Sequence, residues 1–180
     1  LIFDEVQSGF GRTGKLFAHE LYKTKPDIMT MAKALGGGVA IGAMAATDKI
    51  MKSFVPGTHA ATFGGNPLAC SAALATLKVI TGKNFLNKVN ATGNYFLQRL
   101  QEIARKNPVV KEARGAGLFL ALELNQPGHE IVVDCMNRGF LINCIQQNVL
   151  RFIPPLTISR KDIDSLVSVL SNSLTKLNGK

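Results

Sequence analysis

Residues 1–7 read Leu1-Ile2-Phe3-Asp4-Glu5-Val6-Gln7, three apolar residues followed by the carboxylate of Asp4. An apolar run of this kind predicts a strand that is buried in an α/β sheet. A second apolar segment, residues 28–32, leads to Lys33 and to three glycines at 36–38. Ligands of such sheets bind beyond the carboxyl ends of the strands. We therefore expect Asp4 and Lys33 to lie at the same edge of one sheet.

A carboxylate and an amine at one sheet edge are the pair that pyridoxal phosphate chemistry needs. The lysine forms a Schiff base with the aldehyde of the cofactor, and the carboxylate lies against the pyridinium nitrogen. A lone lysine is usually a solvated surface residue. Lys33 has apolar neighbours on both sides, which favours a cofactor-binding role over a surface role.

Composition limits the other classes of function. The chain has 180 residues and is 46% hydrophobic, enough for one ordinary domain or two small ones with a packed core. No apolar run reaches the roughly 18 residues of a membrane helix. The net charge is +9, but the lysines are scattered and tryptophan is absent, which favours a solvated basic surface over a nucleic-acid patch. Cys70, Cys135 and Cys144 lack metal-ligand spacing and indicate reduced, buried thiols in a cytoplasmic protein without a metal site.

Local signals predict the helices and strands. Asn66 is expected to cap a helix that begins at Pro67, where the missing N–H costs nothing. Ser159 and Asp162 form a capping-box pattern before an amphipathic helix that runs to about Leu177. We also expect a short helix over 16–23, a helix over 49–54 capped by Asp48, a helix over 85–106 broken near Gly93, a helix over 129–138, and strands over 39–47, 109–114, 118–124, 141–145 and 150–153.

An alternative hypothesis comes from Gly9 to Lys15, which match the G-x-x-x-x-G-K part of a nucleotide-binding P-loop. The apolar run that ends in Asp4 and Glu5 also resembles the strand that holds magnesium in such ATPases. Two features count against this P-loop NTPase hypothesis. Leu16 stands where a hydroxyl must bind magnesium, and the acidic strand precedes the loop instead of following it on a separate strand.

Four segments together resemble the class III (ornithine-type) aminotransferases, most of all the acetylornithine members of that family. They occur in the family's order and are spread over nearly the whole chain: IFDEVQSGFGRTG at 2–14, TMAKALGGG at 30–38, TFGGNPLA at 62–69 and LRFIPPL at 150–156. One of these motifs alone would be a weak signal, and it is the combination that identifies the family.

The resemblance implies an α/β architecture, the fold-type I PLP-dependent transferase fold of aspartate aminotransferase. Residues 1–80 would be the C-terminal part of the large PLP-binding domain, and residues 81–180 would be the small C-terminal α+β domain. The chain starts inside an apparent strand and without an initiating methionine. We therefore expect an upstream portion to be missing, and we expect the 180 residues alone to be inactive.

The resemblance also implies roles for the residues around the cofactor, pyridoxal 5′-phosphate. Lys33 would hold the cofactor and act as the catalytic base and then acid. Asp4 would pair with the pyridine nitrogen and keep it protonated. Val6 would pack on one face of the ring, and Gln7 would reach the phenolic oxygen. Thr62 would contact the phosphate from the neighbouring subunit, so that a homodimer shares each active site.

The resemblance extends to Arg151 and is less complete at residues 59–61. Arg151 resembles the arginine that grips the substrate α-carboxylate through two parallel hydrogen bonds. Ala60-Ala61 stands where many relatives carry glycine and a hydroxyl residue, which leaves one phosphate contact in doubt. His59 is interpreted as structural.

The implied reaction is transamination of N2-acetyl-L-ornithine with 2-oxoglutarate, giving N-acetyl-L-glutamate 5-semialdehyde and glutamate in arginine biosynthesis. Ornithine, succinylornithine and 4-aminobutyrate remain alternative donors, because similar motifs serve them. A non-catalytic relative is a further alternative, against which the retained Asp4 and Lys33 argue. Partners other than small substrates and a second subunit, such as nucleic acid or a membrane, are not expected.

Overall fold

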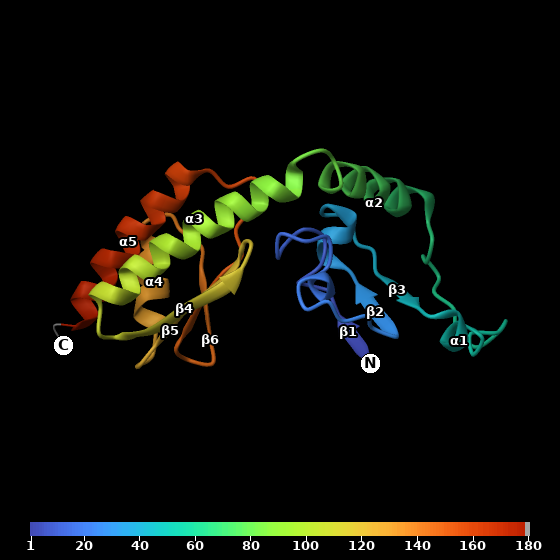
Figure 1. Ribbon diagram of the computed structural model, residues 1–180, viewed down its shortest axis with the longest axis horizontal. Helices are drawn as coiled ribbons and strands as arrows, with labels where there is room; N and C mark the ends of the chain where they lie inside the picture. Colours follow the sequence, from blue (N-terminus) through green and yellow to red (C-terminus); the bar gives the residue numbers. More distant parts are fainter. Residues whose placement is uncertain (179–180) are drawn as a thin grey trace. The chain divides into compact units, whose positions relative to one another are not determined.

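The computed structural model describes residues 1–178, which separate into two compact units (Figure 1). The first unit comprises residues 1–86 and the second begins at Asn87. No helix within the described residues is long and apolar enough to cross a membrane. Each unit has its own sheet, so each is described by itself.

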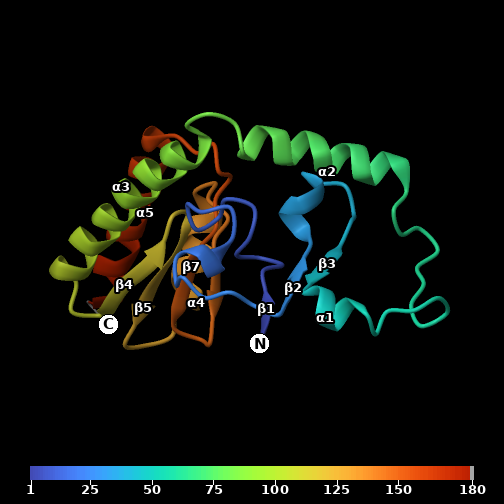
Figure 2. The same cartoon turned by 45° about the vertical axis from the view of Figure 1, so that its right-hand side comes forward.

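The first unit is built on a three-stranded sheet of order β1-β2-β3 (Figure 2). Strands β1 and β2 are parallel, and β2 and β3 are antiparallel. Its elements are β1 (Ile2–Asp4), the 3-10 helix η1 (Ala18–Glu20), β2 (Ile28–Met31), the 3-10 helix η2 (Lys33–Gly36), β3 (Ala43–Ala46), α1 (Asp48–Met51) and α2 (Pro67–Ile80).

The predicted burial of the first strand is wrong for the described residues. Ile2 is 65% exposed and Asp4 is exposed as well. The reason is that β1 is an edge strand, paired with β2 alone within residues 1–178. The side chains of an edge strand have neighbouring side chains on one side only, so they are less covered than those of a central strand.

Helix α2 begins at Pro67, as predicted. The side chain of Asn66 accepts a hydrogen bond from the backbone N–H of Ala69 at 2.9 Å, which satisfies one of the free donors of the first turn. The prediction for Asp48 is wrong, because this residue lies in the first turn of α1 and Thr47 occupies the cap position. An acidic residue is favoured in either place, since the N-terminus of a helix carries partial positive charge.

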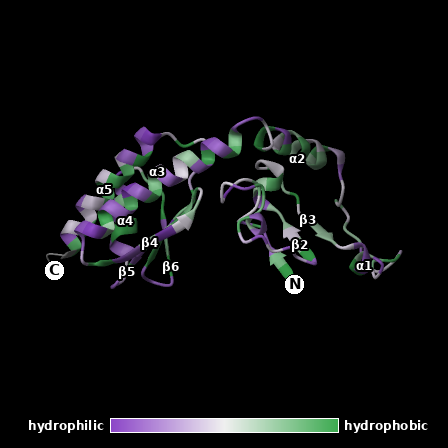
Figure 3. Cartoon of the chain, in the orientation of Figure 1, coloured by the Kyte–Doolittle hydropathy of each residue, from purple (hydrophilic) through white to green (hydrophobic). Residues whose placement is uncertain are grey.

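The second unit has an antiparallel four-stranded sheet of order β4-β5-β7-β6 with helices on one face (Figure 1). Figure 3 shows hydrophobic and hydrophilic residues interspersed along α3 and α5, as expected for helices with one buried face. Its elements are α3 (Phe85–Lys106, which starts in the first unit), β4 (Val110–Ala116), β5 (Phe119–Leu124), α4 (His129–Asn137), β6 (Asn143–Ile145), β7 (Val149–Phe152) and α5 (Arg160–Asn178).

The core of this unit lies between the sheet and the helices. Leu120, Leu122 and Leu124 alternate with more exposed residues along β5, so one face of the strand is buried. On the helix side, the Phe96 ring of α3 meets the Phe152 ring of β7 edge to face, with the two ring centroids 5.4 Å apart. This separation lies within the roughly 4.5–7 Å that aromatic pairs prefer. The opposite face of the sheet, to which the residues between these leucines point, can therefore carry polar residues.

The expected break of α3 at Gly93 is wrong, because α3 is continuous from Phe85 to Lys106. A Cβ atom built on Gly93 would lie 2.2 Å from the backbone oxygen of Gly117. The glycine is thus explained by a close approach between the helix and the turn after β4, a contact that the sequence order does not reveal.

Helix α5 starts with the predicted capping box. The hydroxyl of Ser159 donates to Asp162 at 2.6 Å, and the backbone N–H of Asp162 donates to the same hydroxyl at 3.2 Å. The backbone N–H of Ser159 donates in turn to the Asp162 carboxylate at 3.3 Å. These bonds satisfy donors that a helix start otherwise leaves free.

The three cysteines are free. Cys135 is buried as predicted, and burial raises the pKa of its thiol to about 11. Cys70 and Cys144 are only partly buried, which contradicts the prediction for those two. Within the described residues, no cluster of three or more His, Cys, Asp or Glu side chains could hold a metal ion.

Candidate active site

The pairing of β1 with β2 brings the predicted acid and amine to one edge of the sheet. The two strands run parallel, with Asp4 beside Thr30. Lys33 follows the end of β2 by two residues. Because the carboxyl ends of parallel strands meet at the same edge, Asp4 and Lys33 leave the sheet on the same side, as the sequence predicts.

The carboxylate of Asp4 is held in place by its own loop and by β2. Its Oδ1 accepts a hydrogen bond from the backbone N–H of Val6 at 2.9 Å. The Thr30 hydroxyl donates to the same oxygen at 3.4 Å. The side chain is exposed, so a ligand nitrogen beyond the sheet edge can reach the carboxylate.

Lys33 has an unusual backbone conformation. Its φ is +47°, in the left-handed region that L-residues other than glycine seldom adopt. Such a conformation costs on the order of 1–3 kcal/mol and is found most often at functional sites. Lys33 is the first residue of the 3-10 helix η2, and its side chain is exposed. The strained backbone supports a functional role for Lys33, and it could not be predicted from the sequence.

The glycines after Lys33 do two different things. A Cβ on Gly37 would lie 2.4 Å from the Thr76 hydroxyl of α2, so this glycine permits η2 to pack against the helix. Gly38 has a φ of +116° and no atom within 4 Å of a built Cβ. Gly37 therefore serves packing, whereas Gly38 leaves open space after η2.

Val6 and Gln7 lie in the turn directly after β1, and both are half-buried. Their position next to Asp4 is compatible with the predicted contacts to a ring and its oxygen. Thr62 lies in an exposed, irregular segment before α2, together with Ala60-Ala61. Its predicted contact with a phosphate from a neighbouring subunit stays a prediction.

Sequence reasoning missed the role of Glu5, which is 1% exposed. Its carboxylate accepts hydrogen bonds from the Ser8 hydroxyl at 2.5 Å, from the backbone N–H of Ala18 at 3.0 Å and from that of His19 at 2.8 Å. A buried carboxylate needs such donors. Glu5 therefore ties the glycine-rich loop to the strand end that carries Asp4.

This loop excludes the nucleotide-binding alternative. Gly9 to Lys15 form turns, and the next element is the three-residue helix η1 instead of the long helix whose N-terminus would hold phosphates. The carboxylate of Glu5 would have to face magnesium, but it instead accepts hydrogen bonds from the backbone N–H groups of Ala18 and His19. The P-loop interpretation is wrong.

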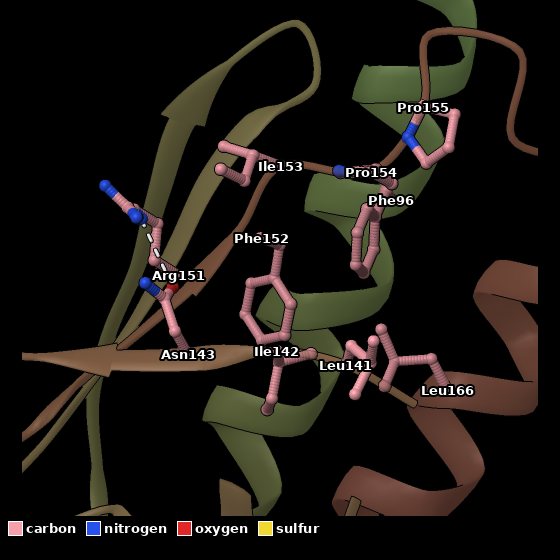
Figure 4. Close-up of a pocket in the computed structure, with 10 residues that line it drawn as sticks. All are labelled: Phe96, Leu141, Ile142, Asn143, Arg151, Phe152, Ile153, Pro154, Pro155 and Leu166. Atoms are coloured by element: carbon pink, nitrogen blue, oxygen red, sulfur yellow. Dashed lines mark hydrogen bonds between the residues drawn. The ribbon is translucent and has the colours of Figure 1, made fainter. Parts of the chain in front are cut away.

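Arg151 lies in the second unit as the penultimate residue of β7. It lines a cavity of about 390 Å³ together with apolar residues of α3, α5 and the segment after β7 (Figure 4). The guanidinium Nε–H donates to Oδ1 of Asn143 in β6 at 3.2 Å. Figure 4 shows these two side chains on one side of the strand and Phe152 and Phe96 on the other.

The family model described as aminotransferase class-III matches residues 1–174. The chain belongs to the class III aminotransferases. It is 49% identical to the acetylornithine aminotransferase of Methanocaldococcus jannaschii and 48% identical to that of Caldanaerobacter subterraneus. In each case the match covers 98% of this chain, and 44% or 45% of the relative. The chain thus spans less than half the length of these relatives.

Solved structures agree with the family. The ornithine aminotransferase of Toxoplasma gondii matches with a TM-score of 0.91 and 34% identity, over 99% of this chain and 44% of that one. The acetylornithine aminotransferase of Elizabethkingia anophelis matches with a TM-score of 0.88 and 32% identity, over 97% of this chain and 47% of that one. The fold is that of fold-type I PLP-dependent transferases, as predicted.

Class III aminotransferases are PLP-dependent, and one Toxoplasma structure is described with PLP at its active site. The residues of this chain fit that cofactor. An exposed carboxylate and an exposed amine leave the same sheet edge, and the amine is carried by a strained backbone. Asp4 can pair with a protonated ring nitrogen, and Lys33 can hold an aldehyde carbon.

Proposed function

We propose that the full-length protein carrying this chain is an aminotransferase that transfers the amino group of N2-acetyl-L-ornithine to 2-oxoglutarate. The observation that carries this proposal is the parallel β1–β2 pair, which delivers Asp4 and Lys33 to one sheet edge. Such a pair suits amino-group transfer better than binding alone, because a binding module needs no amine at this position.

When bound, pyridoxal phosphate supplies an electron sink for the substrate carbon that carries the transferred amino group, which is C5 in N2-acetyl-L-ornithine. Asp4 keeps a proton on the ring nitrogen, while Val6 and Gln7 position the ring. The Nζ atom of Lys33 would hold the cofactor and, when free, would take the proton from the substrate carbon that carries the transferred amino group, as a general base. Thr62 contributes to phosphate binding from a second subunit, so the active enzyme is a homodimer.

Arg151 binds the α-carboxylate of the substrate. A guanidinium forms two parallel hydrogen bonds with a carboxylate and so fixes orientation as well as affinity. In this scheme residues 1–80 belong to the large cofactor-binding domain and residues 81–180 form the small domain. The two compact units, which divide after Leu86, are compatible with that assignment.

The choice of donor is supported by the names of similar proteins. The two relatives above, at 49% and 48% identity, are acetylornithine aminotransferases. Ornithine is the second candidate, because the ornithine aminotransferase of Oceanobacillus iheyensis is 43% identical. A contact between Arg151 and the α-carboxylate does not discriminate between them, since both donors carry that carboxylate and differ in the acetyl group on N2.

The test is a donor panel with the full-length protein. N2-acetyl-L-ornithine, L-ornithine, N2-succinyl-L-ornithine and 4-aminobutyrate are compared by kcat/KM with 2-oxoglutarate as acceptor. We expect the highest value for the acetylated donor, with Lys33→Ala inactive toward all four. A higher kcat/KM for L-ornithine would refute N2-acetyl-L-ornithine as the donor, and turnover by Lys33→Ala would refute the proposed role of Lys33.

A further inference from the structure

Thr30 of β2 contacts the end of β1 with both its backbone and its side chain. In the parallel pairing of the two strands, Thr30 lies beside Asp4. Its carbonyl oxygen accepts a hydrogen bond from the backbone N–H of Glu5 at 3.0 Å, and its hydroxyl donates to Oδ1 of Asp4 at 3.4 Å. The side chain of Thr30 thus reaches the carboxylate that the proposed function assigns to the ring nitrogen of the cofactor.

The hydrogen bonds to the Asp4 carboxylate both end on the same oxygen. Oδ1 accepts the backbone N–H of Val6 at 2.9 Å, and it also accepts the Thr30 hydroxyl, which comes from the neighbouring strand. A carboxylate oxygen has about two acceptor positions, so these two donors fill Oδ1. A further donor that comes from beyond the sheet edge is therefore assigned to the second oxygen, Oδ2.

We propose that Thr30 is a positioning residue for Asp4, because its hydroxyl fixes the rotation of the carboxylate that pairs with the ring nitrogen. This inference rests on the proposed function, which gives Asp4 that role. The Val6 N–H belongs to the turn that follows Asp4 directly, so it moves together with the carboxylate. The Thr30 hydroxyl belongs to β2, the strand that leads to Lys33, and it therefore ties the acid to the strand that also places the amine.

The Asp4 side chain needs a second contact for a defined orientation. The torsion that turns the plane of an aspartate carboxylate is broad, and Asp4 is exposed, so packing does not fix this plane. One hydrogen bond from the Val6 N–H leaves the plane free to turn about that bond. A second donor from β2 limits the motion, so that the carboxylate is oriented before the cofactor binds and less ordering is required on binding.

The test compares two ligands of the full-length protein: pyridoxal phosphate and its 1-deaza analogue, which has a carbon atom in place of the ring nitrogen. The Kd of each is measured by absorbance titration of the cofactor-free protein. Thr30→Val removes the hydroxyl and keeps the β-branched shape, whereas Thr30→Ser keeps the hydroxyl. Thr24→Val is the matched control, because Thr24 is also half-buried and its hydroxyl donates to the carbonyl oxygen of Tyr22 at 3.1 Å.

The expected effect is modest, because 3.4 Å is long for a bond between a hydroxyl and a carboxylate. We expect the Kd for pyridoxal phosphate to rise about fivefold in Thr30→Val and to stay within about twofold of wild type in Thr30→Ser and Thr24→Val. The Kd for the deaza analogue should not change in any of these variants, because the analogue has no ring nitrogen that could pair with Asp4. In an Asp4→Ala background, Thr30→Val should have no further effect.

The outcomes separate the positioning role from the proposed function. An unchanged Kd for pyridoxal phosphate in Thr30→Val, an equal rise for both ligands, or the same loss in Thr30→Ser would overturn the positioning role and leave transamination standing. Equal weakening of both ligands in Asp4→Ala would refute the pairing of Asp4 with the ring nitrogen and the positioning role with it. A rise for pyridoxal phosphate alone in Thr30→Val, in a protein that transaminates none of the donors, would support the positioning role and refute the proposed function.

Discussion

Replacement of Glu5 tests whether the buried carboxylate holds the loop next to the proposed cofactor site. In Glu5→Ala, three donors lose their acceptor: the Ser8 hydroxyl and the backbone N–H groups of Ala18 and His19. A hydrogen bond to a charged group is worth about 1.5–3 kcal/mol, and such terms do not add fully within one network. We expect a loss of about 3–5 kcal/mol in the free energy of unfolding of this unit.

The isosteric variant Glu5→Gln separates the loss of the carboxylate charge from the loss of the whole side chain. Glutamine keeps one acceptor oxygen but points an NH2 group at donors, so we expect a loss of roughly 2 kcal/mol. The matched control is Glu20→Gln, because Glu20 is exposed and accepts one hydrogen bond, from the backbone N–H of Phe17 at 2.9 Å. Its loss should stay below about 1 kcal/mol.

The assay is urea unfolding of the full-length protein, followed by circular dichroism, in parallel with cofactor retention after gel filtration. Glu5→Gln should unfold at lower urea and release pyridoxal phosphate faster than Glu20→Gln. Equal stability and equal cofactor retention in the two variants would refute the argument that Glu5 anchors the loop.

Three further predictions concern the two units. Gly93→Ala should destabilise the protein by about 1–3 kcal/mol in thermal unfolding because its Cβ would meet the Gly117 backbone, whereas Gly42→Ala, with its nearest atom at 3.6 Å, should be nearly neutral; equal stability would contradict the close approach. The hydrogen bond from Ser159 lowers the pKa of Asp162 below 3.8, so its stabilisation is full above that pH and is lost as the pH falls through the lowered value; the stability difference from Asp162→Asn should shrink below about pH 4 and not above pH 7. The 180-residue chain, which spans less than half the length of its relatives, should show no transamination of any donor in the panel by itself, and measured turnover would contradict this expectation.

Features set by neighbouring residues could be predicted from the sequence. The Asn66 cap, the Ser159–Asp162 capping box and the two ends of α3 follow from short-range patterns. The joint arrival of Asp4 and Lys33 at one edge also followed, because two apolar runs that each end in a functional group are typical of parallel strands.

Features that depend on distant partners could not be predicted. In the sequence Glu5 is only a second acidic residue beside Asp4. The fold places the backbone N–H groups of Ala18 and His19 where they donate to its carboxylate. In the sequence Gly93 resembles a helix break, because the backbone of Gly117, which requires a glycine there, is distant along the chain. The partnership of Arg151 with Asn143 depends on the register of β6 and β7, which a turn between them sets.

The central claim is that Lys33 carries the cofactor beside Asp4. The direct measurement is borohydride reduction of the full-length protein with bound pyridoxal phosphate, followed by peptide mass mapping. The account predicts one pyridoxyl group per chain, on the peptide that contains Lys33, and none in Lys33→Ala. A pyridoxyl group on Lys15 or on any other lysine, with Lys33 unmodified, would contradict it.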